Sequence, residues 1–259
     1  MHRRLDIPCH TPSTYGPLQQ VLAGLTRRAQ HTVRKARPIT PVILNNLLDS
    51  QPHNPLCHIQ THILTVYKAL TLLTFLTMSR SSNMIPESRS AFDPSYILKW
   101  NNIQRLDDGI IISVTKSKTN QFAGKTHLIP LAMSQDPKFC PVKTLTRLVD
   151  LYGSNNLSGA HSVFLIPAHD GSLVPLIKSE FVAWLKSRLT KMGLPAAEYG
   201  MHSFRHGSIQ TAVQQEGNKV LVQLASGHSS DAILGYTHIP PERRFDLSKK
   251  IIASLANNQ

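Results

Sequence analysis

The chain has 259 residues, of which 41% are hydrophobic and 17% charged, which excludes an intrinsically disordered protein and leaves enough chain for a buried core. Lys and Arg total 28 against 15 Asp and Glu, and this surplus predicts a polyanionic partner because neutralising phosphates releases counterions. The three cysteines form no C-x-x-C pair, which argues against a disulfide framework and a thiolate zinc site and favours an intracellular protein.

The positive charge is concentrated at the N-terminus. Residues 1–38 hold seven Lys and Arg against a single acidic residue, Asp6. Apolar residues at helical spacing predict a helix over 17–35, with basic residues near its C-terminal end, where they suit the helix dipole. We therefore expect a basic arm or linker that lies against an acidic partner; the alternative is a merely solvated tail.

Two prolines mark the boundary after this arm. Pro38 and Pro41 cannot continue the first helix, so a linker is expected there. Thr40 suits the N-cap and Pro41 the first position of a new helix that runs through Leu48. A further helical stretch is predicted over 59–78, and its longest apolar run is too short to span a bilayer.

A β-rich section follows the second helix. The β-branched run 109–115 and the segment 126–131 predict an antiparallel hairpin with a basic turn at 116–120. A helix should begin at Pro141, with an apolar stripe of Val142, Leu145, Leu148 and Val149.

Helices dominate the remainder. One is predicted over 177–192, and short helices separated by Gly207, Gly217 and Gly227 are expected after His202. The predicted fold class is mainly α with a small antiparallel β-sheet.

The last third of the chain carries a cluster suited to phosphate chemistry. It contains His202-Ser-Phe-Arg205, then Gly227-His228, then Tyr236-Thr-His. Arg is a forked, permanently charged ligand for phosphoryl oxygens, and His can hydrogen-bond or take up a proton near neutral pH. Tyr offers an oxygen nucleophile that can hold a covalent intermediate.

Together these motifs resemble the tyrosine recombinase (phage integrase) family over roughly residues 36–255. His202-Ser-Phe-Arg205 looks like the family's H-x-x-R box, and the segments around His228 and Tyr236 look like its second His and nucleophile boxes. The spacing before Tyr236 is most similar to the eukaryotic DIRS and Crypton mobile-element branch. The resemblance implies the tyrosine recombinase catalytic-domain fold over 39–259.

The resemblance also predicts two upstream residues. Arg80 closes an apolar helix, as the family's first Arg does. Lys118 stands on the hairpin turn where the family's catalytic Lys lies, and Lys116 is its competitor and an expected DNA contact. The other DNA contacts are expected from the arm, at Arg27, Arg28, Arg34 and Lys35.

Each residue has a role in the reaction that the resemblance implies. Tyr236 would attack the scissile phosphodiester of double-stranded DNA and form a 3′-phosphotyrosyl bond. Arg80 and Arg205 would clamp the non-bridging oxygens, assisted by His228. His202 would act as general base and Lys118 as general acid. We expect no metal and no cofactor, because these cations supply the positive charge.

Two features depart from the family pattern. The position three residues after the first Arg is commonly acidic, and here it is Asn83. Residues 1–38 match at best the last helix of the family's DNA-clamping domain, so the arm is interpreted as a remnant of that domain or a linker.

Other interpretations of the same residues stay open. His202 and His206 share the spacing of zinc enzymes, but Ser203 stands where the catalytic Glu would be. A domesticated, non-cutting DNA-binding protein or a type IB topoisomerase-like nicking-closing enzyme would share the basic surface. We expect a nuclear location if the source is eukaryotic. The predicted C-terminal helix, 242–255, would pack on its own core or dock into a neighbouring subunit of a tetramer on DNA.

Overall fold

The computed structural model describes residues 36–116, 126–153, 157–216, 218, 221–222, 225–226 and 241–257. The chain divides into two compact units, Met1–Lys35 and Ala36–Gln259, and everything described lies in the second. The helix predicted over 17–35 and the division at residue 38 therefore stay predictions.

The first two helices of the described residues begin and end close to where the sequence places them. Helix α2 spans Pro41–Leu48, and the Thr40 side chain caps it by accepting a hydrogen bond from the Ile43 amide at 3.3 Å. Helix α3 spans His58–Thr77.

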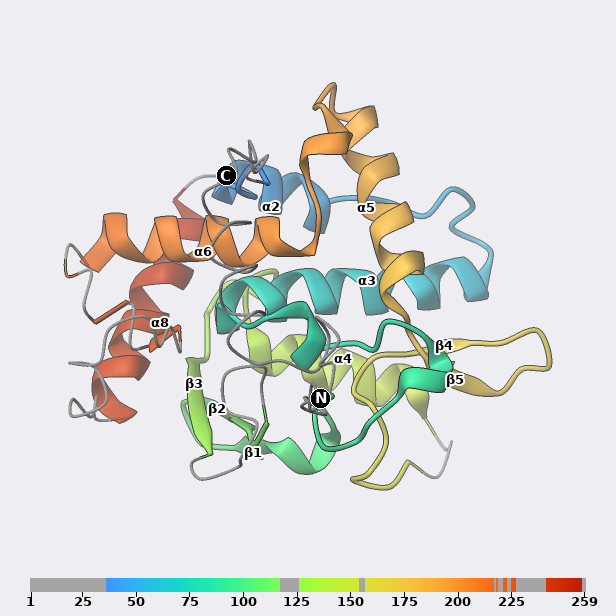
Figure 1. The fold of residues 1–259 in the computed structure, drawn as a ribbon, viewed down its shortest axis with the longest axis horizontal. Coiled ribbons are helices and arrows are strands. Elements are labelled where there is room, and N and C mark those ends of the chain that lie inside the picture. Colours follow the sequence, from blue (N-terminus) through green and yellow to red (C-terminus); the bar gives the residue numbers. More distant parts are fainter. Residues whose placement is uncertain are drawn as a thin grey trace, which may run out of the picture. The chain divides into compact units, whose positions relative to one another are not determined.

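Helix α3 lies at the centre of the described part of the second unit. Figure 1 shows α2 and α6 on one side of it and α4 on the other. Every residue of its last two turns, from Leu70 to Thr77, is buried. By length and composition α3 could cross a membrane, but 61% of its most apolar window is buried inside the protein, as expected of a core helix.

The predicted hairpin is confirmed and extended by one strand. Strand β2, Gly109–Val114, pairs antiparallel with β3, His127–Ala132, and the short strand β1, Ile103–Arg105, pairs with the other edge of β2. The paired residues Ile110 and Leu131 face the core. A second small sheet, absent from the sequence-based prediction, joins β4, Leu165–Pro167, to β5, Leu173–Pro175.

Two helices pack around this framework as predicted. Helix α4 spans Pro141–Tyr152 and buries Val142, Leu145 and Leu148, but Val149 is 54% exposed, so its assignment to the apolar stripe was wrong. Helix α5 spans Lys178–Lys191. Short 3₁₀ turns complete the connections, at Ser81–Asn83, Arg89–Ala91, Trp100–Asn102 and Ala196–Glu198.

The prediction of short helices after His202 was wrong at Gly207. Helix α6 runs unbroken over Met201–Glu216 and contains Gly207 in its interior. A Cβ at this position would lie 1.8 Å from the backbone oxygen of Ile39. The absence of a side chain at Gly207 therefore allows the linker 36–40 to lie against α6. The Ile39 amide donates to the Ser203 carbonyl there at 2.9 Å.

The last helix, α8, spans Pro241–Ala256 and packs beside β3 and α6, as the left of Figure 1 shows. Its apolar residues lie within the protein's own core: Leu247, Ile251, Ile252 and Leu255. Of the two interpretations of this helix, packing on its own core is therefore the arrangement in this structure.

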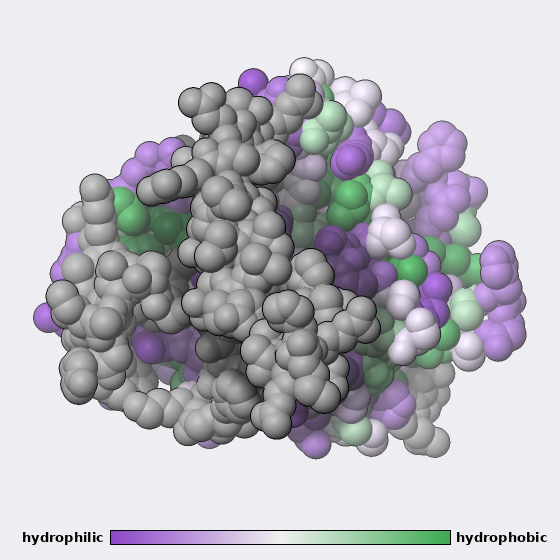
Figure 2. Space-filling view, viewed as in Figure 1, coloured by the Kyte–Doolittle hydropathy of each residue, from purple (hydrophilic) through white to green (hydrophobic). Residues whose placement is uncertain are grey.

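Two of the loops that project from the core carry hydrophilic side chains on the described surface. Figure 2 shows hydrophilic side chains over the connection between α2 and α3 and over the tip of the β4–β5 hairpin. His53, Asn54, His169 and Asp170 are among the residues there.

Candidate functional site

The end of α3 fixes the position of Arg80. Met78 adopts a left-handed conformation, with φ of 52°, and stops the helix in the middle of the core. The chain turns there, and two residues later Arg80 emerges as a half-buried residue that precedes the 3₁₀ turn Ser81–Asn83. The sequence placed Arg80 at the close of an apolar helix, and the structure agrees.

Arg205 lies inside α6 and reaches two other segments. Its side chain is buried, with 9% of its surface exposed. Nη1 donates to the Met78 carbonyl at 2.8 Å and Nη2 donates to the Ser226 carbonyl at 3.0 Å. Arg205 therefore holds the end of α3 and the segment 225–226 in fixed positions relative to α6.

The two arginines lie within electrostatic reach of one another. Burial lowers the pKa of Arg205 to about 10, and the positive charge of Arg80 contributes to this lowering. Arg205 still carries its charge at neutral pH. Two like charges held together in a partly desolvated place favour the binding of an anion between them, since an anion relieves both the repulsion and the loss of hydration.

His202 lies in the first turn of α6, three residues before Arg205. Positions three apart are neighbours on a helix surface, and the His202 side chain is exposed whereas Arg205 is buried. The turn is fixed by the Gly200 amide, which donates to the Ser203 hydroxyl at 3.0 Å. His202 is thus exposed to solvent one helical turn before Arg205.

His206 is engaged with the linker. Its Nδ1 lies 3.1 Å from the Ala36 carbonyl oxygen. Among the residues that the structure describes, no group of three or more His, Cys, Asp or Glu side chains could hold a metal ion.

Several predicted site residues lie outside the described part of the chain, so their roles stay predictions: Lys118, His228 and Tyr236 for catalysis, and Arg27, Arg28, Arg34 and Lys35 for DNA contact. Lys116 is described. Its Nζ lies 5.7 Å from the centre of the Tyr96 ring, and its backbone carbonyl accepts a 2.7 Å hydrogen bond from Asn83 Nδ2.

Two residues near the site, His127 and Arg244, are not indicated by the sequence. His127, the first residue of β3, contacts both Arg244 of α8 and the carbonyl of Ala225. Burial lowers the pKa of His127 to about 4, with the charges of Arg244 and Arg205 contributing, while the hydrogen bond to Ala225 opposes the shift. These contacts join residues far apart in the chain, so no sequence spacing indicates them.

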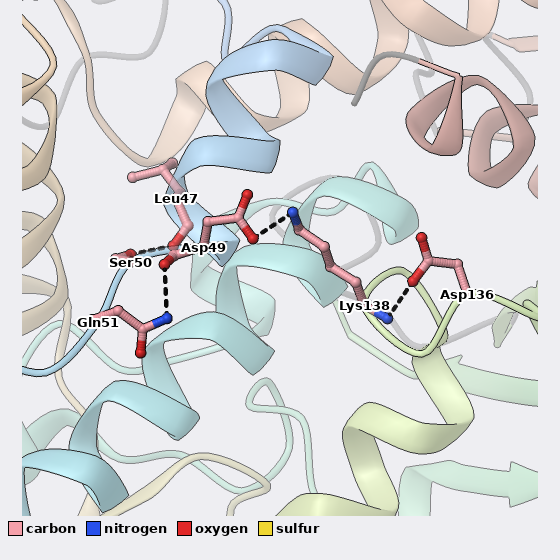
Figure 3. Close-up of polar contacts among 6 residues, drawn as sticks. All are labelled: Leu47, Asp49, Ser50, Gln51, Asp136 and Lys138. Carbon is pink, nitrogen blue, oxygen red and sulfur yellow. Dashed lines mark hydrogen bonds and ion pairs between the residues drawn. The ribbon is translucent and has the colours of Figure 1, made fainter. Parts of the chain in front are cut away.

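A second group of charges lies where α2 ends. Figure 3 shows the ion pair of 2.5 Å between Asp49 and Lys138, which ties this end to the loop before α4. The pKa of Lys68 is lowered first by burial and then by Lys138, Arg147 and Arg188, whereas Asp49 raises it. The cations Lys138, Arg147 and Arg188 therefore lie within electrostatic reach of Lys68, and the Asp49 carboxylate offsets part of their effect.

The similarity of this chain to known proteins lies in its fold and not in its sequence. No protein-family model matches the sequence, and no curated protein matches it. The XerH site-specific recombinase bound to difH substrate, in a pre-cleavage complex, is similar with a TM-score of 0.52 and 18% identity over 79% of this chain. A post-cleavage XerH complex with palindromic difH matches with a TM-score of 0.50 and 15% identity over 86% of this chain.

This is the catalytic-domain fold of tyrosine recombinases. The chain spans about half the length of the XerH chains, of which 51% and 53% are covered. A weaker likeness, the FLP Recombinase-Holliday Junction Complex, has a TM-score of 0.47 and 17% identity over 86% of this chain and 56% of its own. The predicted fold class is confirmed.

Proposed function

We propose that this chain is a site-specific DNA recombinase or integrase that breaks and rejoins DNA strands through a 3′-phosphotyrosyl intermediate. The observation that carries the proposal is that Arg80 and Arg205 lie within electrostatic reach of one another in a recombinase fold. These arginines come from the end of α3 and from α6, and the Met78 carbonyl links the end of one helix to the side chain of the other. A pair of cations built this way suits one phosphodiester.

In the proposed reaction one bond to phosphorus forms as another breaks, and each proton has a donor and an acceptor. The Tyr236 oxygen attacks phosphorus while its proton passes to His202, and the bond from phosphorus to the 5′-oxygen breaks. Lys118 donates a proton to that oxygen, which leaves as a 5′-hydroxyl. Arg80, Arg205 and His228 stabilise the negative charge on the non-bridging oxygens. A 5′-hydroxyl from another strand then reverses the step, so ATP is not needed.

The proposed setting follows the resemblance of the sequence. Double-stranded DNA is the partner, with Lys116 and the basic arm among its contacts, and a homotetramer forms on DNA. We infer a role in integration or excision of a mobile element of the DIRS or Crypton kind, in the nucleus of a eukaryotic source. The net charge of +13 supports the DNA partner, and the XerH structures are complexes with difH.

A nicked suicide substrate made from element-terminus DNA tests the proposal. The wild-type protein should form a covalent protein–DNA adduct that resists denaturation. Tyr236→Phe should form none and should still bind DNA, whereas Tyr199→Phe, which changes a different tyrosine, should form the adduct normally.

The remaining outcomes separate the alternatives. DNA binding with no adduct from the wild-type protein contradicts the recombinase and favours a non-cutting DNA-binding protein. An adduct that rejoins its own strand and never a second duplex favours a topoisomerase-like nicking-closing enzyme.

A further inference from the structure

His127 stands where three segments of the chain meet. Its Nε2 lies 3.2 Å from the carbonyl oxygen of Ala225, and its Nδ1 lies 3.3 Å from Nη1 of Arg244. Arg244, in the first turns of α8, also donates from Nη1 to the Leu128 carbonyl at 2.7 Å. Strand β3, the segment 225–226 and α8 therefore share one hydrogen-bonded junction.

The chemistry of the partners fixes the tautomer of this histidine. A guanidinium has donors and no acceptor, so Arg244 must donate to Nδ1. A carbonyl has no donor, so the ring hydrogen must lie on Nε2 and point to Ala225. The neutral Nε2–H imidazole satisfies both partners, whereas a protonated ring would direct a second N–H at Arg244.

The junction acts on the backbone that leads to His228. Ala225 and Ser226 are consecutive buried residues, and their two carbonyls are taken by two different side chains. His127 binds the first and Arg205 binds the second, at 3.0 Å. Arg205 is also one of the two arginines, with Arg80, that are proposed to bind the phosphate. The junction at His127 and this arginine therefore hold adjoining peptide groups.

We propose that His127 is a positioning residue that holds the segment entering the Gly227-His228 motif, and that Arg244 fixes the tautomer in which it does so. This inference rests on the proposed function, because His228 matters only if the chain cleaves DNA. It adds a polar link from β3 and α8 to Ala225, three residues before His228 in the sequence.

Two variants of His127 separate the two hydrogen bonds. His127→Gln places an amide near the Nε2 position and keeps a donor for the Ala225 carbonyl. His127→Asn places its amide near Nδ1, so it keeps an acceptor for Arg244 and does not reach Ala225. On the suicide substrate we expect the Gln variant to form adduct within about threefold of the wild-type rate and the Asn variant to be slower by about tenfold or more.

The inference is overturned if both variants cleave at the wild-type rate, or if the Gln variant is as slow as the Asn variant while both remain folded.

An NMR measurement without DNA tests the role of His127 even if the wild-type protein does not cleave. Nitrogen NMR of the wild-type ring should show the Nε2–H tautomer at pH 7, and the backbone amides of residues 225–228 should shift in the Asn variant more than in the Gln variant. A ring protonated on Nδ1 contradicts the junction. Absence of wild-type cleavage with the expected NMR result contradicts the proposed function and leaves the junction standing.

Discussion

Asn83 donates a 2.7 Å hydrogen bond from Nδ2 to the backbone carbonyl of Lys116. The backbone amide of Asn83 donates to the Arg80 carbonyl at 3.0 Å, and its backbone carbonyl accepts from the Leu98 amide at 2.9 Å. A residue that is 5% exposed thus joins the turn after Arg80 to the residues that follow β2. Since the candidate lysines 116 and 118 follow β2, the identity of this residue bears directly on the proposed general acid.

Replacing Asn83 should impair the protonation step in particular. Asn83→Asp removes the donor and directs a negative charge at the Lys116 carbonyl, and Asn83→Ala leaves that carbonyl without this partner. Loss of one such buried hydrogen bond, roughly 1–2 kcal/mol, corresponds to about tenfold slower cleavage. A substrate with sulfur in place of the 5′-bridging oxygen needs no general acid, so it should restore the rate.

The exposed neighbour in the same turn provides the control for this experiment. Ser82→Ala should leave cleavage of both substrates unchanged. Slow cleavage of the sulfur substrate by the Asn83 variants would mean that the turn supports the arginines or the fold, not the lysine.

Gly207→Ala should destabilise the protein. The added methyl would lie 1.8 Å from the Ile39 backbone oxygen, so the linker must move and its hydrogen bond to Ser203 must lengthen. We expect the free energy of unfolding to fall by roughly 1–3 kcal/mol, measured by urea denaturation. Gly200→Ala is the matched control, because a Cβ added at that position would meet no atom within 4 Å; an equal loss in both variants would contradict the close contact.

The pKa of His127 predicts a pH dependence of stability. The folded-state pKa of about 4 lies below the ordinary value of 6.5, so between these values the unfolded chain binds more protons. Stability is therefore fully present above pH 6.5 and falls as the pH drops toward 4, by up to about 3 kcal/mol. Urea denaturation of the wild type and of His127→Gln across this range isolates the contribution, and parallel curves would refute it.

Local signals in the sequence located much of this fold. The Thr40-Pro41 cap, the end of α3 before Arg80 and the β-branched hairpin were all predictable, because each depends on residues within a few positions of one another. The role of Gly207 was not predictable, because it depends on Ile39, whose backbone approaches from a distant part of the chain.

The candidate site was predictable to the extent that it consists of motifs. The resemblance indicated Arg205 through the H-x-x-R motif and Arg80 through its place after an apolar helix, and the two lie within electrostatic reach of one another. The contacts of Asn83, His127 and Arg244 are tertiary hydrogen bonds between side chains and distant carbonyls. Such bonds have no period along the chain, so only the folded arrangement identifies them.

The packing of α8 changes what its removal should do. If α8 packed only against a neighbouring subunit, its deletion would hardly change the stability of the monomer. Leu247, Ile251 and Ile252 are instead buried in this chain's own core. Ile251→Ala should therefore lower the free energy of unfolding by about 2–5 kcal/mol at any protein concentration, measured by urea denaturation. Asp246→Ala, at an exposed position of the same helix, should change it by less than about 0.5 kcal/mol. A loss for Ile251→Ala that appears only at concentrations where subunits associate would place this face of α8 between subunits instead.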